Sequence, residues 1–184
     1  RNHDHLFSTI GELLGRDDLI LAGDAARLEG KLLCGGLRVK TEQRGKKEAL
    51  SSGIRLFPNA GIATQTKGNA WLGVSCGSSG QGGLGGHGHN DKNSFELSVN
   101  QLDFVVDGGC PYYTSFLNTR NRFRSTFAHS TLAVLGKEQN ELSFHLSGVC
   151  RLPETAEPNL ELLNGTLIKG VHSGFGILHR RIFF

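Results

Sequence analysis

The sequence has 184 residues, with 20 Lys and Arg against 17 Asp and Glu, which gives a formal net charge of +3 at pH 7. This small charge is spread along the chain and argues against a nucleic-acid partner, and no apolar run approaches the roughly 20 residues of a membrane span. The chain opens on Arg1 with neither an initiator Met nor a signal-peptide pattern and ends inside an apolar run. We therefore expect an incomplete sequence, with neither nucleic acid nor membrane as its partner.

Residues 1–50 are predicted to be helical at first and then irregular. Apolar residues repeat at helical spacing near the start of the chain, at Phe7, Ile10, Leu13 and Leu14. A second helix is expected over residues 24–33, and the charged stretch 40–47 suits a linker. The predicted domains are accordingly residues 1–50 and 51–184.

The hydrophobic pattern changes from Arg55 onward to short apolar runs between Gly and Asn turns. The predicted strands cover residues 61–66, 70–75, 94–99, 104–106, 131–135, 142–146, 160–163, 166–168 and 177–184. The run 94–99 alternates strictly, and Asn100-Gln101 then fits a tight hairpin into the next strand. Many short strands with turns between them predict a mainly β fold, an antiparallel β-sandwich preceded by a short helical segment.

Two short motifs point to other protein classes. Residues 73–77 match the nucleophile elbow G-x-S-x-G around Ser75, but the Gly- and Ser-rich residues that follow disfavour the helix that this motif needs. A serine hydrolase is therefore the least favoured function. Residues 80–85 match a dinucleotide fingerprint, which also lacks its helix. The four cysteines form no C-x-x-C pair, which excludes a zinc finger.

The densest chemical signal lies between His87 and His129. His87 and His89 are two residues apart, so in an extended segment both imidazoles project to one side. Asp107 follows the second strand of the predicted hairpin, and His129 precedes the next predicted strand. Two histidines and one aspartate form an ordinary ligand set for zinc. The alternative is structural: two loop histidines, and an aspartate that forms a turn before two glycines.

Several stretches of the second half resemble the heparinase II/III-like polysaccharide lyases. The stretches are FPNAGIA (57–63), GHGHNDKNSFEL (86–97), VDGG (106–109), YY (112–113), RNRFRSTFAHST (120–131), HSGF (172–175) and HRR (179–181). They follow one colinear order over about residues 55–184. That order is more specific than any single motif in the chain.

The resemblance implies a fold, an activity and a location. Members of this family have an N-terminal (α/α) toroid followed by a β-sandwich, and they cleave uronate-containing polysaccharides by β-elimination. Residues 1–50 would then be the last helices of the toroid, and residues 51–184 a sandwich truncated at its C-terminus. Heparan sulfate, alginate and hyaluronan are the substrate types that it suggests. The protein would be periplasmic or secreted, and this segment alone inactive, because the toroid supplies groups that neutralise the uronate carboxylate.

The resemblance also assigns roles to residues. By this match His89, Asp107 and His129 are zinc ligands, and His87 is the active-site histidine beside them. Tyr113 matches the tyrosine that transfers a proton, and Tyr112 is the neighbour that can replace it. The chain departs from the family pattern at three places, which are Gly108, Cys110-Pro111 and Ser130. The change at Cys110-Pro111 leaves open which tyrosine faces the cleft.

Three alternating arginines complete the candidate site. Arg120, Arg122 and Arg124 lie along one stretch and are candidates for binding an anionic sugar chain. Their alternative interpretation is a solvated, charged edge strand. Two functions therefore stay open for the chain: the sandwich part of a lyase, or a non-catalytic module that binds zinc and glycan. The oligomeric state has no signal in the sequence.

Overall fold

The computed structural model describes residues 10, 11, 14, 16, 19, 52–112, 114–145, 148 and 150–184. The chain divides into two compact units, Arg1–Leu50 and Ser51–Phe184, and the second holds nearly all of the described residues. Ile10, Gly11 and Leu14 of the first predicted helix are helical. The rest of that helix, the second predicted helix and the whole predicted linker lie outside the described residues.

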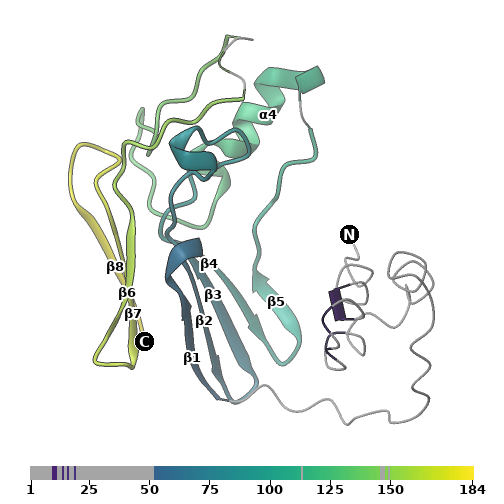
Figure 1. The fold of residues 1–184 in the computed structure, drawn as a ribbon, viewed down its shortest axis with the longest axis vertical. Coiled ribbons are helices and arrows are strands. Elements are labelled where there is room, and N and C mark those ends of the chain that lie inside the picture. The colour runs from purple at the N-terminus through teal and green to yellow at the C-terminus, as the bar shows by residue number, and fades with distance from the viewer. Residues whose placement is uncertain are drawn as a thin grey trace. The chain divides into compact units, whose positions relative to one another are not determined.

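Five antiparallel strands form the first sheet (Figure 1). They are β1 (Gly53–Phe57), β2 (Ile62–Lys67), β3 (Ala70–Ser75), β4 (Ser94–Val99) and β5 (Leu102–Val105). Each strand pairs with the next one along the chain. Sequential pairing reverses the chain direction at every step, so successive connections lie at alternate ends of the sheet. The connections at one end are short turns, and those at the other end are longer.

The β4–β5 hairpin has the predicted turn. Asn100 and Gln101 adopt positive φ angles of 54° and 65°, and Val99 pairs with Leu102 across them. Two central residues with positive φ form the turn whose twist suits a two-residue hairpin, and Asn tolerates that conformation well. This hairpin turns β5 back along β4, so the residues after β5 leave the sheet at the end where β4 begins.

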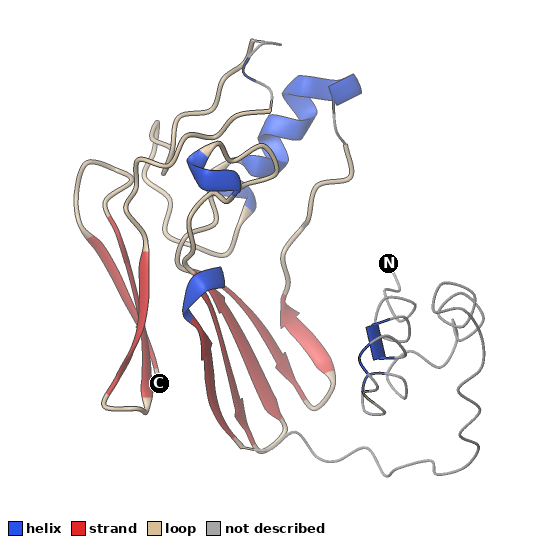
Figure 2. Cartoon of the chain, in the orientation of Figure 1, coloured by secondary structure: helices blue, strands red, loops and turns tan. Residues whose placement is uncertain are grey.

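Three antiparallel strands form a second sheet: β6 (Asn159–Leu163), β7 (Leu167–His172) and β8 (His179–Phe183). Figure 2 shows it facing the first sheet. Buried side chains from both sheets form one core, namely Ala63, Val74, Cys76, Leu160 and Ile168. A core between two antiparallel sheets is a β-sandwich, so the predicted fold class is confirmed.

Two predicted strands are wrong. Residues 131–135 form only an isolated bridge between Val134 and Lys137, and the described residues of 142–146 form no strand. Leu132 and Leu135 are 46% and 92% exposed, so this apolar run does not contribute a buried face to a sheet. An apolar run predicts a strand only where a partner strand and a core are available to it.

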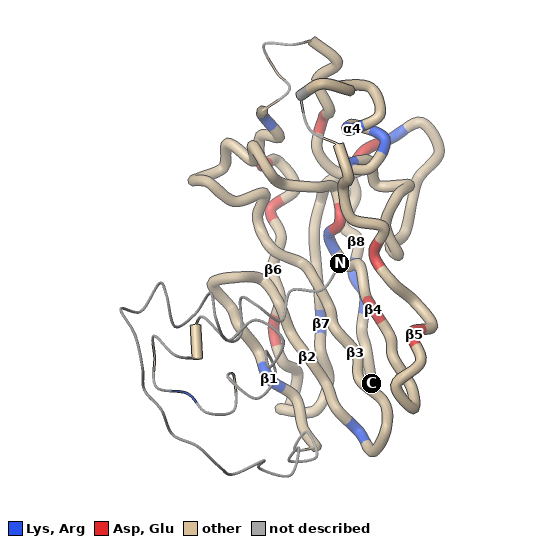
Figure 3. The backbone as a smooth tube through the Cα atoms, turned by 90° about the vertical axis from the view of Figure 1, so that its right-hand side faces the viewer, with Lys and Arg blue, Asp and Glu red and all other residues tan. Residues whose placement is uncertain are grey.

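The stretch on which the three arginines alternate forms a helix. The helix α4 covers Leu117–Arg124, between the 3-10 turns η4 (Thr114–Phe116) and η5 (Thr126–Ala128). The expectation of an extended edge strand here is wrong. Figures 1 and 2 show α4 and the long connections gathered at one end of the two sheets. Lys and Arg are distributed over several elements, among them β1, β7 and α4 (Figure 3).

Among the described residues no helix is long and apolar enough to span a membrane. Cys76, Cys110 and Cys150, the cysteines in this part of the chain, are free thiols.

Candidate functional site

The candidate site lies at the end of the first sheet where three strands meet long connections. Ser75, the last residue of β3, pairs with Ser94, the first residue of β4. Leu97 of β4 pairs with Val105, the last residue of β5, and Asp107 follows two positions later. The histidine-containing connection before β4 and the connection after β5 therefore start from the same end of the sheet.

Asp107 and His129 are in direct contact. The Asp107 Oδ2 oxygen lies 2.5 Å from the His129 Nδ1 nitrogen. The hydrogen bond from His129 lowers the pKa of Asp107 below its ordinary value, against the effect of burial. Burial alone would lower the pKa of His129, but the hydrogen bond and charge of Asp107 outweigh it and raise that pKa. The contact therefore favours the ionised form of the Asp107 carboxyl and the protonated form of the His129 imidazole.

His89 lies beside this pair. Its ring centroid is 5.2 Å from that of His129, with the ring planes tilted by 39°. Burial, and after it the nearby positive charge of His129, lower the pKa of His89 to about 4. His89 is therefore a neutral imidazole at pH 7, the form that binds a metal ion or accepts a proton. The structure thus brings together the three side chains that the sequence analysis expected to meet.

A polar cavity of about 260 Å³ borders His89. His87, His89 and Asp91 line it together with serine hydroxyls from the end of β3 and the connection that follows. His87 is exposed at this cavity. Asp91 is half-buried, and this burial raises the pKa of its carboxyl; the Ser75 hydroxyl donates a long hydrogen bond of 3.5 Å to it. The cavity therefore offers donors and acceptors on the side of the loop where His87 is accessible.

The same contacts argue against the serine-hydrolase interpretation. The Ser75 hydroxyl donates to a carboxylate, whereas a nucleophilic serine needs a histidine as its base. Residues 76–80, which follow Ser75, form no helix. The glycine motif at 80–85 likewise has only the three-residue turn η3 (Gln81–Gly83) and antiparallel neighbours, so a dinucleotide site is excluded there.

The glycine-rich loop that carries His87 is closely packed. A Cβ added at Gly85 would lie 2.3 Å from the Leu152 carbonyl oxygen, and one at Gly88 would lie 2.6 Å from the Ser79 carbonyl oxygen. Gly85 also has a φ of 61°, which side chains rarely adopt. The glycines therefore let the main chain approach its neighbours closely and do not mark a flexible linker.

The three predicted substrate-binding arginines do not share one environment. Arg120 and Arg124 are 3% and 1% exposed, and their guanidinium groups donate to carbonyls of the glycine-rich loop. Only Arg122 is exposed. The helix places Arg120 and Arg124 on its inner face, because residues four positions apart lie on one side of a helix. The prediction that Arg120 and Arg124 face the sugar chain is therefore wrong, and for Arg122 sugar binding stays a prediction.

The two tyrosines lie in the connection between β5 and α4. Tyr112 is 42% exposed, and its ring packs edge-on against Phe116 at a centroid distance of 5.3 Å. Tyr113, the preferred proton-transfer residue, lies outside the described residues. Its role, and the choice between the two tyrosines, stay predictions.

Glu138 is a site residue that the sequence analysis missed. Its carboxylate accepts hydrogen bonds from the Ser125 hydroxyl, from the Thr126 amide and hydroxyl and from the Asn90 side chain, at 2.5 to 2.9 Å. Asn90 follows His89, and Thr126 precedes His129 by three positions. Glu138 therefore fixes the spacing of the two histidine segments. A lone glutamate in a polar connection gives no sequence signal of such a role.

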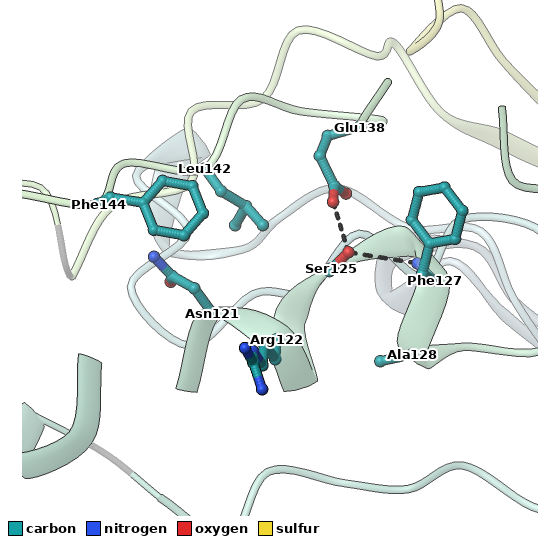
Figure 4. Close-up of a pocket in the computed structure, with 8 residues that line it drawn as sticks. All are labelled: Asn121, Arg122, Ser125, Phe127, Ala128, Glu138, Leu142 and Phe144. Carbon is teal, nitrogen blue, oxygen red and sulfur yellow. Dashed lines mark hydrogen bonds between the residues drawn. The ribbon is translucent and has the colours of Figure 1, made fainter. Parts of the chain in front are cut away.

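Glu138 also borders a second cavity. This cavity has a volume of about 310 Å³ and is lined by Asn121, Arg122, Ser125, Phe127, Ala128, Glu138, Leu142 and Phe144. Figure 4 shows the Glu138 carboxylate pointing toward Ser125, with the Phe127 side chain beside them. Asp107 and His89 do not line it. The first cavity is therefore the one that combines space with the histidine loop, through His87 and His89.

A buried ion pair anchors the far side of the histidine loop. Lys92 is fully buried, and its Nζ lies 3.1 Å from the Glu154 Oε2 oxygen. The same oxygen accepts from the amide and the hydroxyl of Ser79, at 2.7 and 2.9 Å. Glu154 therefore holds both ends of the loop, and the sequence analysis did not identify it.

The described residues contain no group of three or more His, Cys, Asp and Glu side chains close enough together to hold a metal ion as they stand. Asp107 and His129 contact each other, with His89 as their neighbour. The His129 Nε2 atom is buried and has no hydrogen-bond partner among the described residues. An unsatisfied buried imidazole nitrogen of this kind is compatible with a metal ligand.

The chain is similar to known proteins over most of its length. The family model described as Heparinase II/III-like, C-terminal, matches residues 49–184. No curated protein matches the chain. A crystal structure of heparinase III is similar at a TM-score of 0.52, with 23% sequence identity over 71% of this chain and 20% of that chain.

Two further solved structures cover more of the chain. The heparinase III BT4657 gene product with methylated lysines has 16% identity over 94% of this chain and 23% of its own, at a TM-score of 0.57. Heparan sulfate lyase HepC from Pedobacter heparinus has 17% identity over 98% of this chain and 25% of its own, at a TM-score of 0.56. These likenesses show a shared fold, and the chain spans 20% to 25% of the length of the three structures.

Proposed function

The chain belongs to the heparinase II/III-like C-terminal family, and from that premise we propose that it is the β-sandwich part of a polysaccharide lyase. The lyase cleaves glycans that contain uronic acid, by β-elimination. Two of the similar structures are titled heparinase III and heparan sulfate lyase, which supports an acidic polysaccharide as the substrate class. Heparan sulfate is the first substrate to test, and hyaluronan and alginate are the alternatives.

One observation of the structure carries the proposal. Asp107 and His129 bond to each other beside His89, and His87 of the same loop is exposed at a polar cavity. Imidazoles next to a carboxylate form an arrangement that can hold and move protons. A site of this kind at the end of a sheet suits a reaction whose central step is the removal of a proton.

The proposed reaction removes the proton from C5 of a uronate. The electron pair of that C–H bond forms a double bond between C4 and C5, the glycosidic C4–O bond breaks, and the departing oxygen takes up a proton. Tyr113 transfers the proton in this proposal, Tyr112 is its alternative, and His87 faces the sugar beside it. A tyrosine hydroxyl, with an ordinary pKa of about 10, needs nearby positive charge to act as a base at neutral pH.

We further propose that His89, Asp107 and His129 hold a zinc ion. Imidazole and carboxylate are ligands that zinc accepts, and the Asp107 carboxylate, the His129 imidazole and the His89 ring lie next to one another. When bound, zinc would supply positive charge close to the reacting sugar. The residues of the chain have their own role without it, because the Asp107–His129 contact already orients the His129 ring toward His89.

The test is turnover of uronate polymers by the full-length protein. β-Elimination creates an unsaturated uronate, whose formation is followed by its ultraviolet absorbance. The proposal expects activity that falls strongly in Tyr113→Phe or Tyr112→Phe and in His87→Ala. The 184 residues alone are expected to be inactive. Glycan binding without turnover by the full-length protein would favour the non-catalytic module instead.

Localisation to the periplasm or outside the cell is part of the same proposal, because the polymer is too large to enter a cell unaided. Fractionation of the cells that make the protein tests it. Recovery in the cytoplasmic fraction alone would contradict this location.

A further inference from the structure

Two buried arginines of α4 bind the main chain on both sides of His87. Arg120 donates from Nη2 to the Gly86 carbonyl oxygen at 2.6 Å. Arg124 donates from Nε to the Gly88 carbonyl oxygen at 2.8 Å. The carbonyl groups immediately before and after His87 are therefore both held by guanidinium groups of one helix.

Arg124 makes further contacts that join the helix to the loop. Its Nη2 donates to the Gly85 carbonyl oxygen at 3.1 Å and to that of Arg151 at 3.3 Å. The Arg124 carbonyl oxygen in turn accepts from the Asn90 amide at 2.9 Å. The contact therefore runs in both directions, from the helix to residues 85–88 and from residue 90 back to the helix.

Burial makes these hydrogen bonds strong and their loss costly. Burial lowers the pKa of Arg124 to about 10, and the neighbouring charge of Arg120 contributes, so Arg124 remains charged at pH 7. A hydrogen bond from a charged donor is stronger than a neutral one, and a buried donor without a partner is strongly unfavourable. The hydrogen bonds therefore satisfy the buried guanidinium donors and, at the same time, hold the loop carbonyl groups in place.

The loop around His87 is held mainly through its main chain: besides the arginine contacts, the Gly86 amide donates to the Gln81 side-chain oxygen at 2.7 Å and the Gly88 amide to the Gly85 carbonyl oxygen at 3.0 Å. Of residues 85–88, only His87 has a side chain, because the other three are glycines. Glycine has the largest conformational freedom of any residue, so a segment rich in it keeps one conformation only where main-chain contacts impose it. The arginine hydrogen bonds supply such contacts on one side, and the carbonyl of Leu152 packs against Gly85 on the other.

We propose that Arg120 and Arg124 are positioning residues, which fix the imidazoles of His87 and His89 by binding the carbonyl groups of Gly85, Gly86 and Gly88. The inference rests on the proposed lyase function, since it assigns the two arginines to the same site. They act behind the loop and do not contact the sugar.

The test replaces each arginine by lysine in the full-length protein. Arg124→Lys and Arg120→Lys keep the charge and the aliphatic stem but lose the planar fork that reaches several carbonyls at once. Amide hydrogen exchange of residues 86–90 is expected to rise about tenfold or more, while exchange in β2 and β3 stays unchanged. Turnover, kcat, should fall by about 100-fold, as for a displaced catalytic group, with a much smaller change in KM. Arg180→Lys on the exposed surface of β8 is the matched control and should change neither.

Hydrogen exchange is measured without substrate. It therefore tests whether Arg120 and Arg124 hold the loop even if the wild-type protein proves inactive and the proposed function fails. Unchanged exchange of residues 86–90 in both variants would overturn the inference. A uniform rise across both sheets would also overturn it, because that pattern reports general destabilisation. Faster exchange of residues 86–90 with full kcat would also overturn it, because the arginine hydrogen bonds would then not position groups for the reaction. If Arg124→Lys does not fold, the milder Arg120→Lys carries the test.

Discussion

Asp107 and His129 are 22 positions apart in the sequence, yet the carboxylate Oδ2 of one lies 2.5 Å from the imidazole Nδ1 of the other. This contact joins the connection after β5 to the turn η5 and closes the site around His89. It depends on charge as well as on shape, because Asp107 raises the pKa of His129 against the effect of burial.

Asp107→Asn removes the negative charge and keeps the shape of the side chain. We expect zinc affinity to fall by at least about tenfold, the scale set by groups that merely support metal ligands. The melting temperature should change little, since the Asp107 side chain is 30% exposed. Elemental analysis after dialysis against a graded chelator measures the affinity. Asp103→Asn on the exposed face of β5 is the matched control. Equal zinc content in the two variants would rule out Asp107 as a ligand.

The pH dependence of stability should report His172 in the second sheet. Its side chain is fully buried, and its Nε2 lies 2.8 Å from the Nδ1 of His179. Burial lowers the pKa of His172 from 6.5 to about 4, and His179 adds to the effect. The folded protein therefore holds His172 neutral, whereas the unfolded chain takes up a proton at a higher pH.

The stabilisation from neutral His172 is thus complete above about pH 6.5 and is lost as the pH falls toward 4. It amounts to at most about 3 kcal/mol, the free energy that corresponds to this shift. Denaturant unfolding at several pH values measures it. The slope should flatten between pH 6.5 and 4 in His172→Gln. The exposed His145→Gln should keep the wild-type slope, and an unchanged slope in both would refute the assignment to His172.

The sequence predicted the sheets better than the connections. The residue ranges of β3 and β4 were predicted without error. A short apolar run after the Gly68-Asn69 turn defines β3, and strict alternation before the Asn100-Gln101 turn defines β4. The helix α4 was missed because its residues, LNTRNRFR, include only two apolar side chains. Its signal was the spacing of Arg120 and Arg124 by four positions, which a helix places on one face.

The site was predictable only in part for a related reason. The position of Asp107 after β5 follows from the hairpin, since strand direction fixes the end of the sheet at which it emerges. The roles of Glu138 and Glu154 depend on contacts between distant connections, and no local pattern encodes such contacts. A buried carboxylate is recognised only once its partners are placed around it.

Gly88→Ala tests the close packing of the histidine loop. The added Cβ would lie 2.6 Å from the Ser79 carbonyl oxygen, so main chain must move to admit it. We expect a loss of about 1 to 3 kcal/mol in the free energy of unfolding, the usual cost of overpacking. Gly108→Ala is the control, because a Cβ there meets no atom within 4 Å. Equal stabilities of the two variants would show that the loop yields easily.

The Lys92–Glu154 pair should show strong coupling. Lys92→Met or Glu154→Gln alone leaves one buried charge without its partner, which costs about 3 to 5 kcal/mol. The double variant Lys92→Met/Glu154→Gln removes both charges and should recover much of that loss. Urea unfolding of the wild type, both single variants and the double variant completes the cycle. Additive losses would mean that the 3.1 Å contact does not link the two residues energetically.

Product analysis after incubation of the full-length protein with heparan sulfate tests the central claim most directly. β-Elimination gives oligosaccharides with an unsaturated uronate at the new non-reducing end, each lighter by one water molecule than the product of hydrolysis. The account predicts these products by mass spectrometry and ultraviolet absorbance, and their loss in His87→Ala. Products that carry the added water, or no cleavage of heparan sulfate, hyaluronan or alginate, would contradict it.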